Sequence, residues 1–137
     1  MICLGYLSSA TAVMDPHSLD ALIAHAQRKN ATYAVTGLLC HYDGSFLQFL
    51  EGEEAAVSAI FAAISQDPRH RSLLEIYRDP ISERIFEDWT MAAVALGDVG
   101  PAQRAFATNL RQVELKGAAS HRQALQPFLD IFRAWVR

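Results

Sequence analysis

The sequence predicts an α+β fold with a ferredoxin-like βαββαββ order. Its five-stranded mixed sheet is expected to carry two helices on one face and a C-terminal helical cap on the other. Three observations support this prediction: apolar runs of period two alternate with helical stripes, Asp43-Gly44 marks a tight hairpin, and the apolar tail has helical spacing. Two helices interleaved with strands in this order cover one face of a sheet, so the other face needs cover.

The first strand is predicted over residues 1–8, where Tyr6 shares one face with Leu4 and Ser8. The first helix is predicted from about residue 15 to residue 30, because Asp15 is a capping carboxylate before a proline that suits the first turn. The apolar stripe of this helix contains Leu19, Leu22, Ile23 and Ala26.

A hairpin and a second helix are predicted next. Residues 33–42 and 45–50 are expected to pair, because Asp43-Gly44 readily supplies the positive φ angles of a two-residue turn. An acidic stretch that includes Glu51 is interpreted as the N-terminus of the second helix, which ends before Asp67. The apolar stripe of this second helix contains Val57, Ile60, Phe61 and Ile64.

Two further strands and a helical tail complete the prediction. Residues 73–77 and 90–96 are expected to form strands, joined by an irregular connection over residues 80–86. Residues 1–97 then form the core of one domain, and residues 98–137 form a helical extension of the same domain, packed on the sheet.

Composition narrows the possible functions. The net charge of −3 and pI of about 5.9 provide no basic field for phosphate backbones, so we expect no nucleic acid partner. No segment reaches the roughly 20 apolar residues of a membrane helix and the N-terminus lacks a basic leader, so we expect a cytoplasmic protein without membrane contact. Cys3 and Cys40 are expected to be buried free thiols, and the histidine spacing predicts no metal site.

Three polar residues are candidates for chemistry. Gln48 shares a strand face with Phe46 and Leu50, and burying its amide without hydrogen bonds would cost about 1–3 kcal/mol. A purely structural hydrogen-bond network would also explain it. Tyr6 alone is explained by ring packing, and Asn30 alone as a helix C-cap. All three can nevertheless point into the space between the helices and the sheet.

Several further segments accompany these three residues in a fixed order and spacing. They are Gly5-Tyr6-Leu7-Ser8, Asn30, Val35-Thr36-Gly37-Leu38-Leu39, the stretch from Asp43 to Gly52, Asp67-Pro68-Arg69-His70, and Phe86-Glu87-Asp88-Trp89-Thr90-Met91. This combination resembles the BLUF family of flavin-based blue-light sensors, over residues 1 to about 96. The resemblance implies a flavin-binding core over residues 1–97 in a short photoreceptor that is not an enzyme. It implies FAD as the cofactor, with FMN or riboflavin as alternatives.

The resemblance also implies roles for single residues. The flavin ring would lie between the two helices, with its polar edge on Asn30. Tyr6 would give an electron and a proton, and Gln48 would bridge the Tyr6 hydroxyl and the flavin and change its hydrogen bonds, by rotation or tautomerisation. The aliphatic walls would be Leu22 or Ile23, together with Ile64. Further expected flavin contacts are Ser8, Lys29, Asp67, Arg69 and His70, although a solvated lysine is the plainer interpretation of Lys29.

Signal output is expected through the tail. Trp89 and Met91 occupy the family positions that respond to the glutamine change, although two large core residues would look the same and which of them faces the flavin is left open. Residues 98–137 are expected to pass the signal to a separate downstream protein or to a change in a homo-oligomer.

Three other functions compete with this interpretation. An RNA-binding module would need aromatic residues on the open sheet face and fits the acidic pI poorly. A hydrolase of acylphosphatase type would need glycine and arginine after the first strand, and residues 7–14 contain neither. A flavin-free BLUF fold that acts as a protein-interaction module is the remaining alternative.

Overall fold

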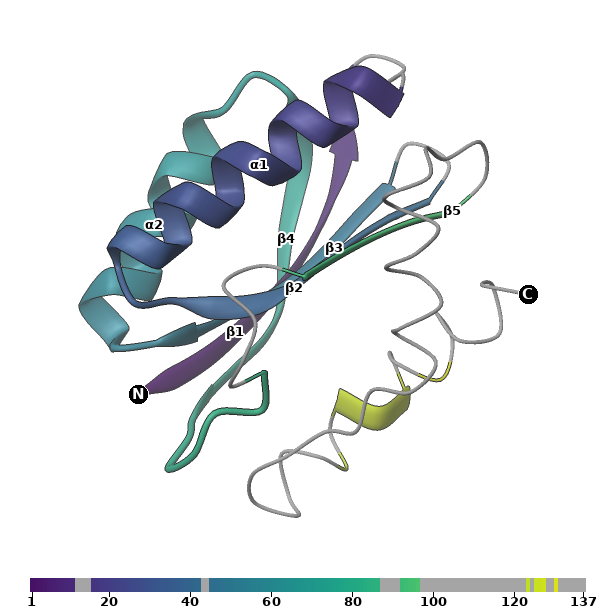
Figure 1. Ribbon diagram of the computed structural model, residues 1–137. Coiled ribbons are helices and arrows are strands. Elements are labelled where there is room, and N and C mark those ends of the chain that lie inside the picture. Colours follow the sequence, from purple (N-terminus) through teal and green to yellow (C-terminus); the bar gives the residue numbers. More distant parts are fainter. Residues whose placement is uncertain are drawn as a thin grey trace.

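The described residues of the computed structural model form a sheet with two helices on one face (Figure 1). They are residues 1–11, 16–42, 45–86, 92–96, 123, 125–127 and 130. The elements are β1 (Ile2–Ala10), α1 (Pro16–Thr32), β2 (Thr36–Tyr42), β3 (Ser45–Gly52), α2 (Glu54–Gln66), β4 (His70–Pro80) and β5 (Ala92–Leu96).

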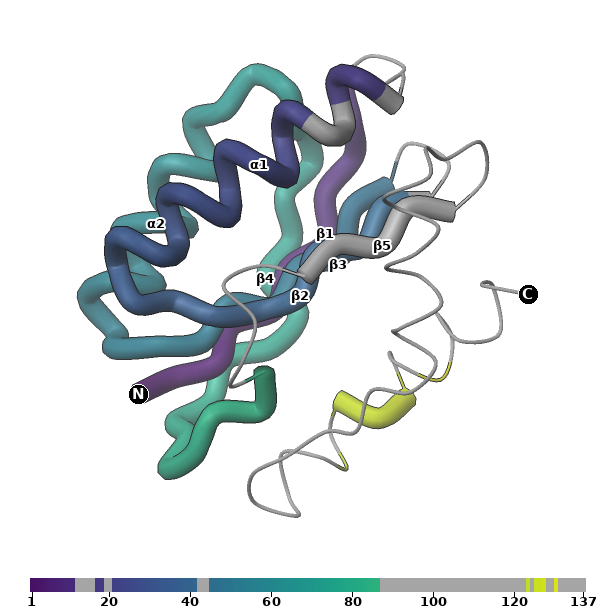
Figure 2. The backbone as a smooth tube through the Cα atoms, viewed as in Figure 1, coloured from purple at the N-terminus to yellow at the C-terminus, as the bar shows by residue number. Residues whose placement is uncertain are grey.

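The strand order in the sheet is β4-β1-β3-β2-β5. β1 lies between β3 and β4 and is antiparallel to both, and β3 is antiparallel to β2. β5 pairs with β2 in parallel at the far edge. The predicted α+β fold is therefore confirmed for its four antiparallel strands and its two helices, and α1 and α2 lie side by side on one face (Figure 2).

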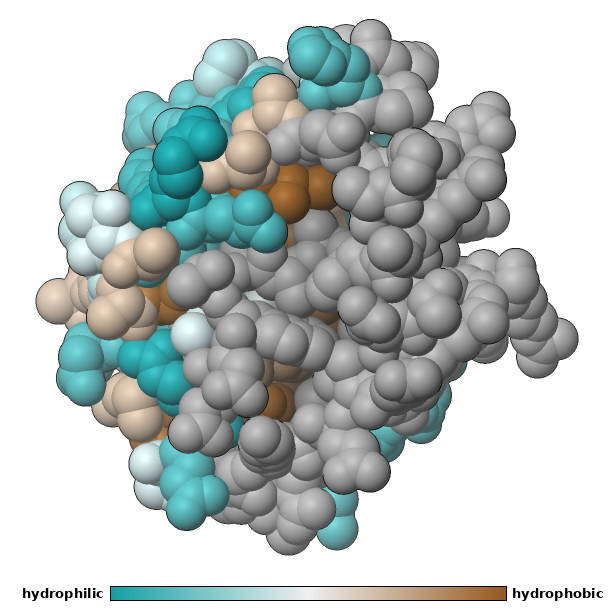
Figure 3. Space-filling model, viewed as in Figure 1, coloured by the Kyte–Doolittle hydropathy of each residue, from teal (hydrophilic) through white to brown (hydrophobic). Residues whose placement is uncertain are grey.

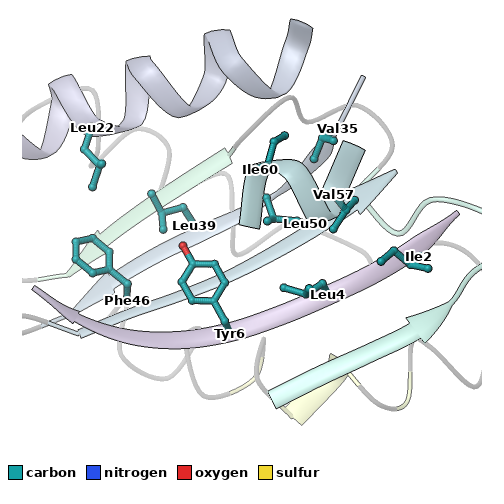
Figure 4. Packing of buried hydrophobic residues seen from close by; sticks show 10 residues of the cluster. All are labelled: Ile2, Leu4, Tyr6, Leu22, Val35, Leu39, Phe46, Leu50, Val57 and Ile60. Atoms are coloured by element: carbon teal, nitrogen blue, oxygen red, sulfur yellow. The ribbon is translucent and has the colours of Figure 1, made fainter. Parts of the chain in front are cut away.

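The core lies between that sheet face and the helices. Tyr6 and Phe46 are its largest side chains with no exposed surface, and they point from β1 and β3 toward the helices (Figure 4). Hydrophilic residues cover the outer side of α1, and hydrophobic surface shows beneath it toward the sheet (Figure 3). The remaining members of the cluster drawn in Figure 4 are Ile2, Leu4, Leu22, Val35, Leu39, Leu50, Val57 and Ile60.

Several predicted boundaries were wrong. α1 continues to Thr32, and the following turn places Ala34 at φ 54°, so β2 begins at Thr36 rather than at residue 33. β4 is an exposed edge strand of 11 residues, about twice its predicted length. Its register against β1 shifts twice, which weakens the period-two pattern that sequence reasoning uses.

The interpretation of Glu51 as an acidic group at the start of α2 was also wrong. Glu51 lies on β3 with 0% of its surface exposed, and α2 begins three residues later with Glu53 at its N-cap. The acidic run therefore divides between a buried strand position and the helix start. The sequence alone did not show where that division falls.

The predicted C-terminal cap falls almost entirely outside the described residues. A helical turn over Leu125–Pro127 is described, and Leu125 is 1% exposed. This turn lies on the side of the sheet away from α1 and α2 (Figure 1). Among the helices that the structure describes, none has the length and apolar character needed to span a bilayer.

Gly37 is required by a close backbone approach between β2 and β3. A Cβ atom at Gly37 would lie 1.9 Å from the carbonyl oxygen of Phe49, which is backbone and cannot rotate away. We expect Gly37→Ala to lower the free energy of unfolding by about 3 kcal/mol or more, because the strands would have to separate. Chemical denaturation measures this loss.

Gly52→Ala is the matched control, because its Cβ would lie 3.3 Å from the nearest atoms, the Ala34 oxygen and a Val35 methyl carbon. We expect a loss of about 1 kcal/mol or less for this variant. Equal losses for the two variants would contradict the assigned β2–β3 register.

Candidate functional site

A buried phenol and a buried amide meet at the centre of the sheet. The antiparallel register of β1 and β3 places Tyr6 directly opposite Gln48. The Tyr6 hydroxyl donates a hydrogen bond to Oε1 of Gln48, and the two residues are 0% and 3% exposed. Burial, with a smaller effect from the Asp67 charge, raises the pKa of Tyr6, so the phenol keeps its proton at neutral pH.

Asn30 presents a second buried amide from the last turn of α1. It is 1% exposed, and its backbone carbonyl accepts the N–H of Val35 at 2.8 Å. Since α1 continues to Thr32, Asn30 lies inside the helix rather than at its C-cap. Its side-chain Nδ2 finds no hydrogen-bond partner among the residues that the structure describes. A buried N–H donor without a hydrogen bond is unfavourable in free energy, so this position calls for an acceptor on a ligand.

A cavity between α1, α2 and the sheet brings these polar groups together. Its empty space, counted out to its open mouth, is about 500 Å³. The ring of Tyr6 also lies 5.6 Å from the ring of Phe61 on α2, which packs against the core cluster. The lining residues are Tyr6, Leu22, His25, Ala26, Lys29, Asn30, Leu39, Gln48, Ile60, Ala63, Ile64, Asp67, Arg69 and His70.

Charged groups after α2 border the mouth of this cavity. Arg69 donates to both carboxylate oxygens of Asp67, with Nη2 at 2.6 Å from Oδ2 and Nε at 3.0 Å from each oxygen. The Arg69 hydrogen bonds hold the pKa of Asp67 at about 2. His70 shares a hydrogen bond of 2.9 Å between its Nδ1 and the Ser8 hydroxyl, and burial lowers the pKa of His70. These contacts fix the directions of the polar side chains at the mouth.

The structure brings most of the predicted site residues together. Ile23 packs against the core cluster instead of lining the cavity, and Ser8 lies behind His70. Trp89 and Met91 lie outside the described residues. The predicted residues that line the cavity are Tyr6, Leu22, Lys29, Asn30, Gln48, Ile64, Asp67, Arg69 and His70.

Sequence reasoning missed five lining residues. Ala26 and Ala63 are small helix residues that leave room between the helices, and helical spacing from Leu22 and Asn30 could have identified Ala26. Leu39 is paired with Gln48 across β2 and β3, so the hairpin register could have identified it. The two other residues are His25 and Ile60.

The residues present fit a flavin ring. Aliphatic side chains from α1 and α2 flank the cavity, and Tyr6, Gln48 and Asn30 are among the polar residues that line it. The ring edge of a flavin combines an N–H donor with carbonyl acceptors, which a carboxamide complements. The unpartnered Nδ2 of Asn30 is the specific observation that supports this fit.

The described part of the chain gives little support for a reactive thiol or a metal site. Cys3 and Cys40 are free and buried, and burial raises the pKa of each thiol. Both therefore remain unreactive thiols at neutral pH. Within the described ranges, no group of three or more histidine, cysteine, aspartate or glutamate residues is arranged to hold a metal ion.

Comparison with known proteins identifies one family. Residues 1–92 match the family model described as BLUF, sensors of blue-light using FAD. The chain is similar to the photoactivated adenylate cyclase subunit beta of Euglena gracilis, with 38% identity over 91 residues. It is also similar to the blue light- and temperature-regulated antirepressor BluF of Escherichia coli, with 38% identity over 68 residues.

The aligned regions are small parts of these relatives. The match covers 66% of this chain but 11% of the cyclase subunit, and 50% of this chain but 17% of the antirepressor. Among solved structures, the dark state of the BLUF protein BlrB is similar at 30% identity with a TM-score of 0.67. That similarity covers 97% of this chain and 96% of BlrB.

Asp67→Asn should destabilise the protein in a pH-dependent way. The folded-state pKa of Asp67 is below its ordinary value of 3.8. The Asp67 carboxylate therefore adds to the free energy of unfolding above about pH 4, and this contribution is lost as the pH falls toward 2. The Arg69 side chain is 39% exposed, so solvent screening limits the loss at pH 7 to about 0.5–1 kcal/mol. Chemical denaturation of the unsubstituted protein and of Asp67→Asn from pH 7 to pH 2 measures the difference in their free energies of unfolding.

Glu75→Gln provides the control, because it removes the exposed pair of Glu75 with Arg78 on β4. We expect its effect to be a few tenths of a kcal/mol. A difference between wild type and Asp67→Asn that stays constant from pH 7 to pH 2 would contradict the role given to the Asp67 carboxylate.

Proposed function

Since the chain belongs to the BLUF family of blue-light sensors, we propose that it is a photoreceptor that binds flavin non-covalently in the cavity between α1, α2 and the sheet. The observation that carries this proposal is the buried hydrogen bond from Tyr6 to Gln48 beside the unpartnered amide of Asn30. A hydrogen-bonded phenol and amide beside a ligand cavity suit a sensor whose states differ in hydrogen bonding.

Tyr6 acts as the electron and proton donor in this proposal. The flavin, when bound, absorbs blue light and becomes a much stronger oxidant. The Tyr6 phenol is protonated at rest, because burial raises its pKa. Loss of an electron makes a phenol strongly acidic, so its proton leaves along the existing hydrogen bond to Oε1 of Gln48. The electron and proton then return to Tyr6.

Gln48 stores the change. Its amide has one accepting and one donating end. A proton accepted at Oε1 permits rotation before it returns to Tyr6, and loss of a proton from Nε2 in its place leaves the tautomer. Either route leaves Gln48 with a different set of hydrogen bonds and shifts the flavin absorption slightly to the red. The altered arrangement relaxes in the dark, so Gln48 acts as a two-state switch.

The cofactor is proposed to be FAD. The description of the family model names FAD, and the contacts proposed for Asn30 and Gln48 are to the ring that FMN and riboflavin share. Leu22 and Ile64 serve as aliphatic walls, and Lys29 with Arg69 lines the cavity where a ribityl or phosphate tail would leave. At this end of the cavity Asp67 holds Arg69, and Ser8 holds His70, through hydrogen bonds.

Output is proposed to pass from β3 through Trp89 and Met91 to the tail. Residues 98–137 would form a helical cap on the open face of the five-stranded sheet. Both faces of the sheet would then be covered by helices. The downstream step is then a separate protein or a change in a homo-oligomer. The similarity to the cyclase subunit covers only the sensor portion, so we assign this chain no enzymatic activity. A flavin-free interaction module is the alternative.

Tyr6→Phe and Gln48→Leu should abolish the light response without abolishing flavin binding. The first removes the transferable proton and the second removes the amide that stores the change. We expect purified, flavin-saturated variants to show no red-shifted spectrum after blue illumination, whereas the unsubstituted protein shows it and recovers in the dark.

Tyr33→Phe is the matched control, since Tyr33 lies in the turn after α1 with 46% of its surface exposed. It should retain the full shift. A full shift in Tyr6→Phe would refute the assigned donor, and a protein that never binds flavin would favour the interaction module.

Asn30→Ala should weaken flavin binding in the dark. Removal of a buried amide that binds the ring edge costs about 1–3 kcal/mol, so we expect the dissociation constant to rise about tenfold or more. Fluorescence titration of the apoprotein with FAD measures this change. Arg28→Ala, an exposed change on the same helix, is the control, and equal affinities for the two variants would remove Asn30 from the site.

A further inference from the structure

Glu51 forms a buried cluster on the face of β3 opposite to Gln48. The cavity does not include Glu51, and the proposed photochemistry does not use it. Its Oε2 accepts the backbone N–H of Ile85 at 2.8 Å, and its Oε1 accepts the backbone N–H of Phe86 at 2.5 Å. The Thr36 hydroxyl donates to the same Oε1 at 2.9 Å. Glu51 therefore attaches β3 to Ile85 and Phe86, which lie 34 and 35 positions later in the sequence.

Arg84 completes this cluster from the same segment. Its Nη1 donates to the Thr36 hydroxyl at 2.9 Å and to the Glu51 carbonyl at 3.1 Å, and its Nη2 donates to the Ala34 carbonyl at 2.7 Å. The segment is thus bonded to the turn after α1, the start of β2 and the end of β3. We call Thr36, Glu51 and Arg84 the Glu51 anchor.

The contacts of the anchor call for an ionised Glu51. The backbone N–H groups of Ile85 and Phe86 donate to its two carboxylate oxygens, one to each, so a proton on either oxygen would face an N–H group. Burial raises the pKa of Glu51 above its ordinary value, and the hydrogen bonds from these donors and the charge of Arg84 offset part of that rise. Charge-assisted hydrogen bonds of this kind are about twice as strong as neutral ones.

Ring packing strengthens the same attachment. Phe49 is adjacent to Gln48 on β3 and points to the same face as Glu51, because side chains alternate along a strand. The Phe49 ring stacks on the Phe86 ring at 6.1 Å and an interplanar angle of 29°. Phe86 is therefore held to β3 through its backbone and through its side chain.

The anchor lies immediately before the segment that contains Trp89 and Met91. On the other side of that segment, β5 pairs with β2 from Leu38↔Ala92 onward. Residues 87–91 are therefore bounded by two attachments to the β2–β3 hairpin: the anchor at residues 84–86 and the parallel pairing of β5. A displacement of β3 reaches residues 84–86 directly through the Glu51 carboxylate and Phe49.

We propose that Glu51 is a positioning residue that couples movement of β3 at Gln48 to the chain that enters residues 87–96. The anchoring itself follows from the contacts above. Its signalling role rests on the proposed photoreceptor function, because Gln48 must switch for a signal to pass.

Glu51→Gln tests the anchor in the full-length protein. The substitution keeps the shape of the side chain but turns one end into a donor, which opposes the N–H of Ile85 or Phe86. We expect the amide hydrogens of these two residues to exchange at least about tenfold faster in the dark, since hydrogen bonds to a charged group are lost. Glu53→Gln is the matched control, because the Glu53 side chain is 78% exposed.

The coupling is tested by comparing light with dark in the same variant. We expect Glu51→Gln to bind flavin and to show the same red shift as the unsubstituted protein. We expect the light-minus-dark difference in hydrogen exchange over residues 92–96 to fall by at least about half. A merely structural anchor would leave this difference unchanged.

Arg84→Met provides a second variant in case Glu51→Gln does not fold. It keeps an unbranched side chain, leaves the Glu51 carboxylate in place and removes the three bonds that Arg84 donates. We expect the dark exchange of the Ile85 and Phe86 amides to become about threefold faster, and the light-minus-dark difference over residues 92–96 to fall. Unchanged dark exchange at Ile85 and Phe86 in the folded variants would overturn the anchor, and an undiminished light-minus-dark difference would overturn the coupling.

These outcomes are distinguishable from failure of the proposed function. If the unsubstituted protein binds flavin but shows no red shift, the photoreceptor proposal and the coupling both fail. The dark comparison of Glu51→Gln with Glu53→Gln would still decide whether the anchor exists.

Discussion

The pairing of β1 with β3 is the constraint on which the rest of the structure depends. This register puts Tyr6 opposite Gln48, and the two side chains satisfy each other in the core. A slip of one residue would turn every side chain of one strand to the other face. The phenol would then lose its acceptor, and Gln48 would face the back of the sheet. The hydrophobic pattern of the core and the polar pair therefore specify the same register.

The cavity follows from this arrangement because the polar groups are not all satisfied by the protein. Tyr6 and Gln48 bind each other, whereas the Nδ2 of Asn30 has no partner among the described residues. An unmade buried hydrogen bond is unfavourable for the free protein, and a ligand that accepts it gains part of that free energy. The apolar walls give such a ligand affinity, and the amide gives it orientation.

The sequence predicted the elements that depend on local patterns. Asp43-Gly44 and the alternation after it defined the hairpin, and the stripe through Leu22 defined α1. Local patterns could not divide the acidic run at Glu51, because the residues that bury it lie more than 30 positions away. The edge strand β4 was underestimated because it is mostly exposed and shifts register twice. The candidate site came from the family resemblance, since Tyr6 and Asn30 each had a plainer explanation alone.

The alternation of side chains along β3 connects the cavity on one face of the sheet with residues 84–86 on the other face. Gln48 faces the cavity, while Phe49 and Glu51 hold residues 84–86 on the opposite face. Only one peptide bond separates the residue proposed to switch from the ring that stacks on Phe86. Because β3 is buried on both faces, the proposed change of hydrogen bonds at Gln48 would be accommodated by a small shift of the whole strand. That shift would move Phe49 and Glu51 together, which explains how a change confined to one amide can reach the far face of the sheet.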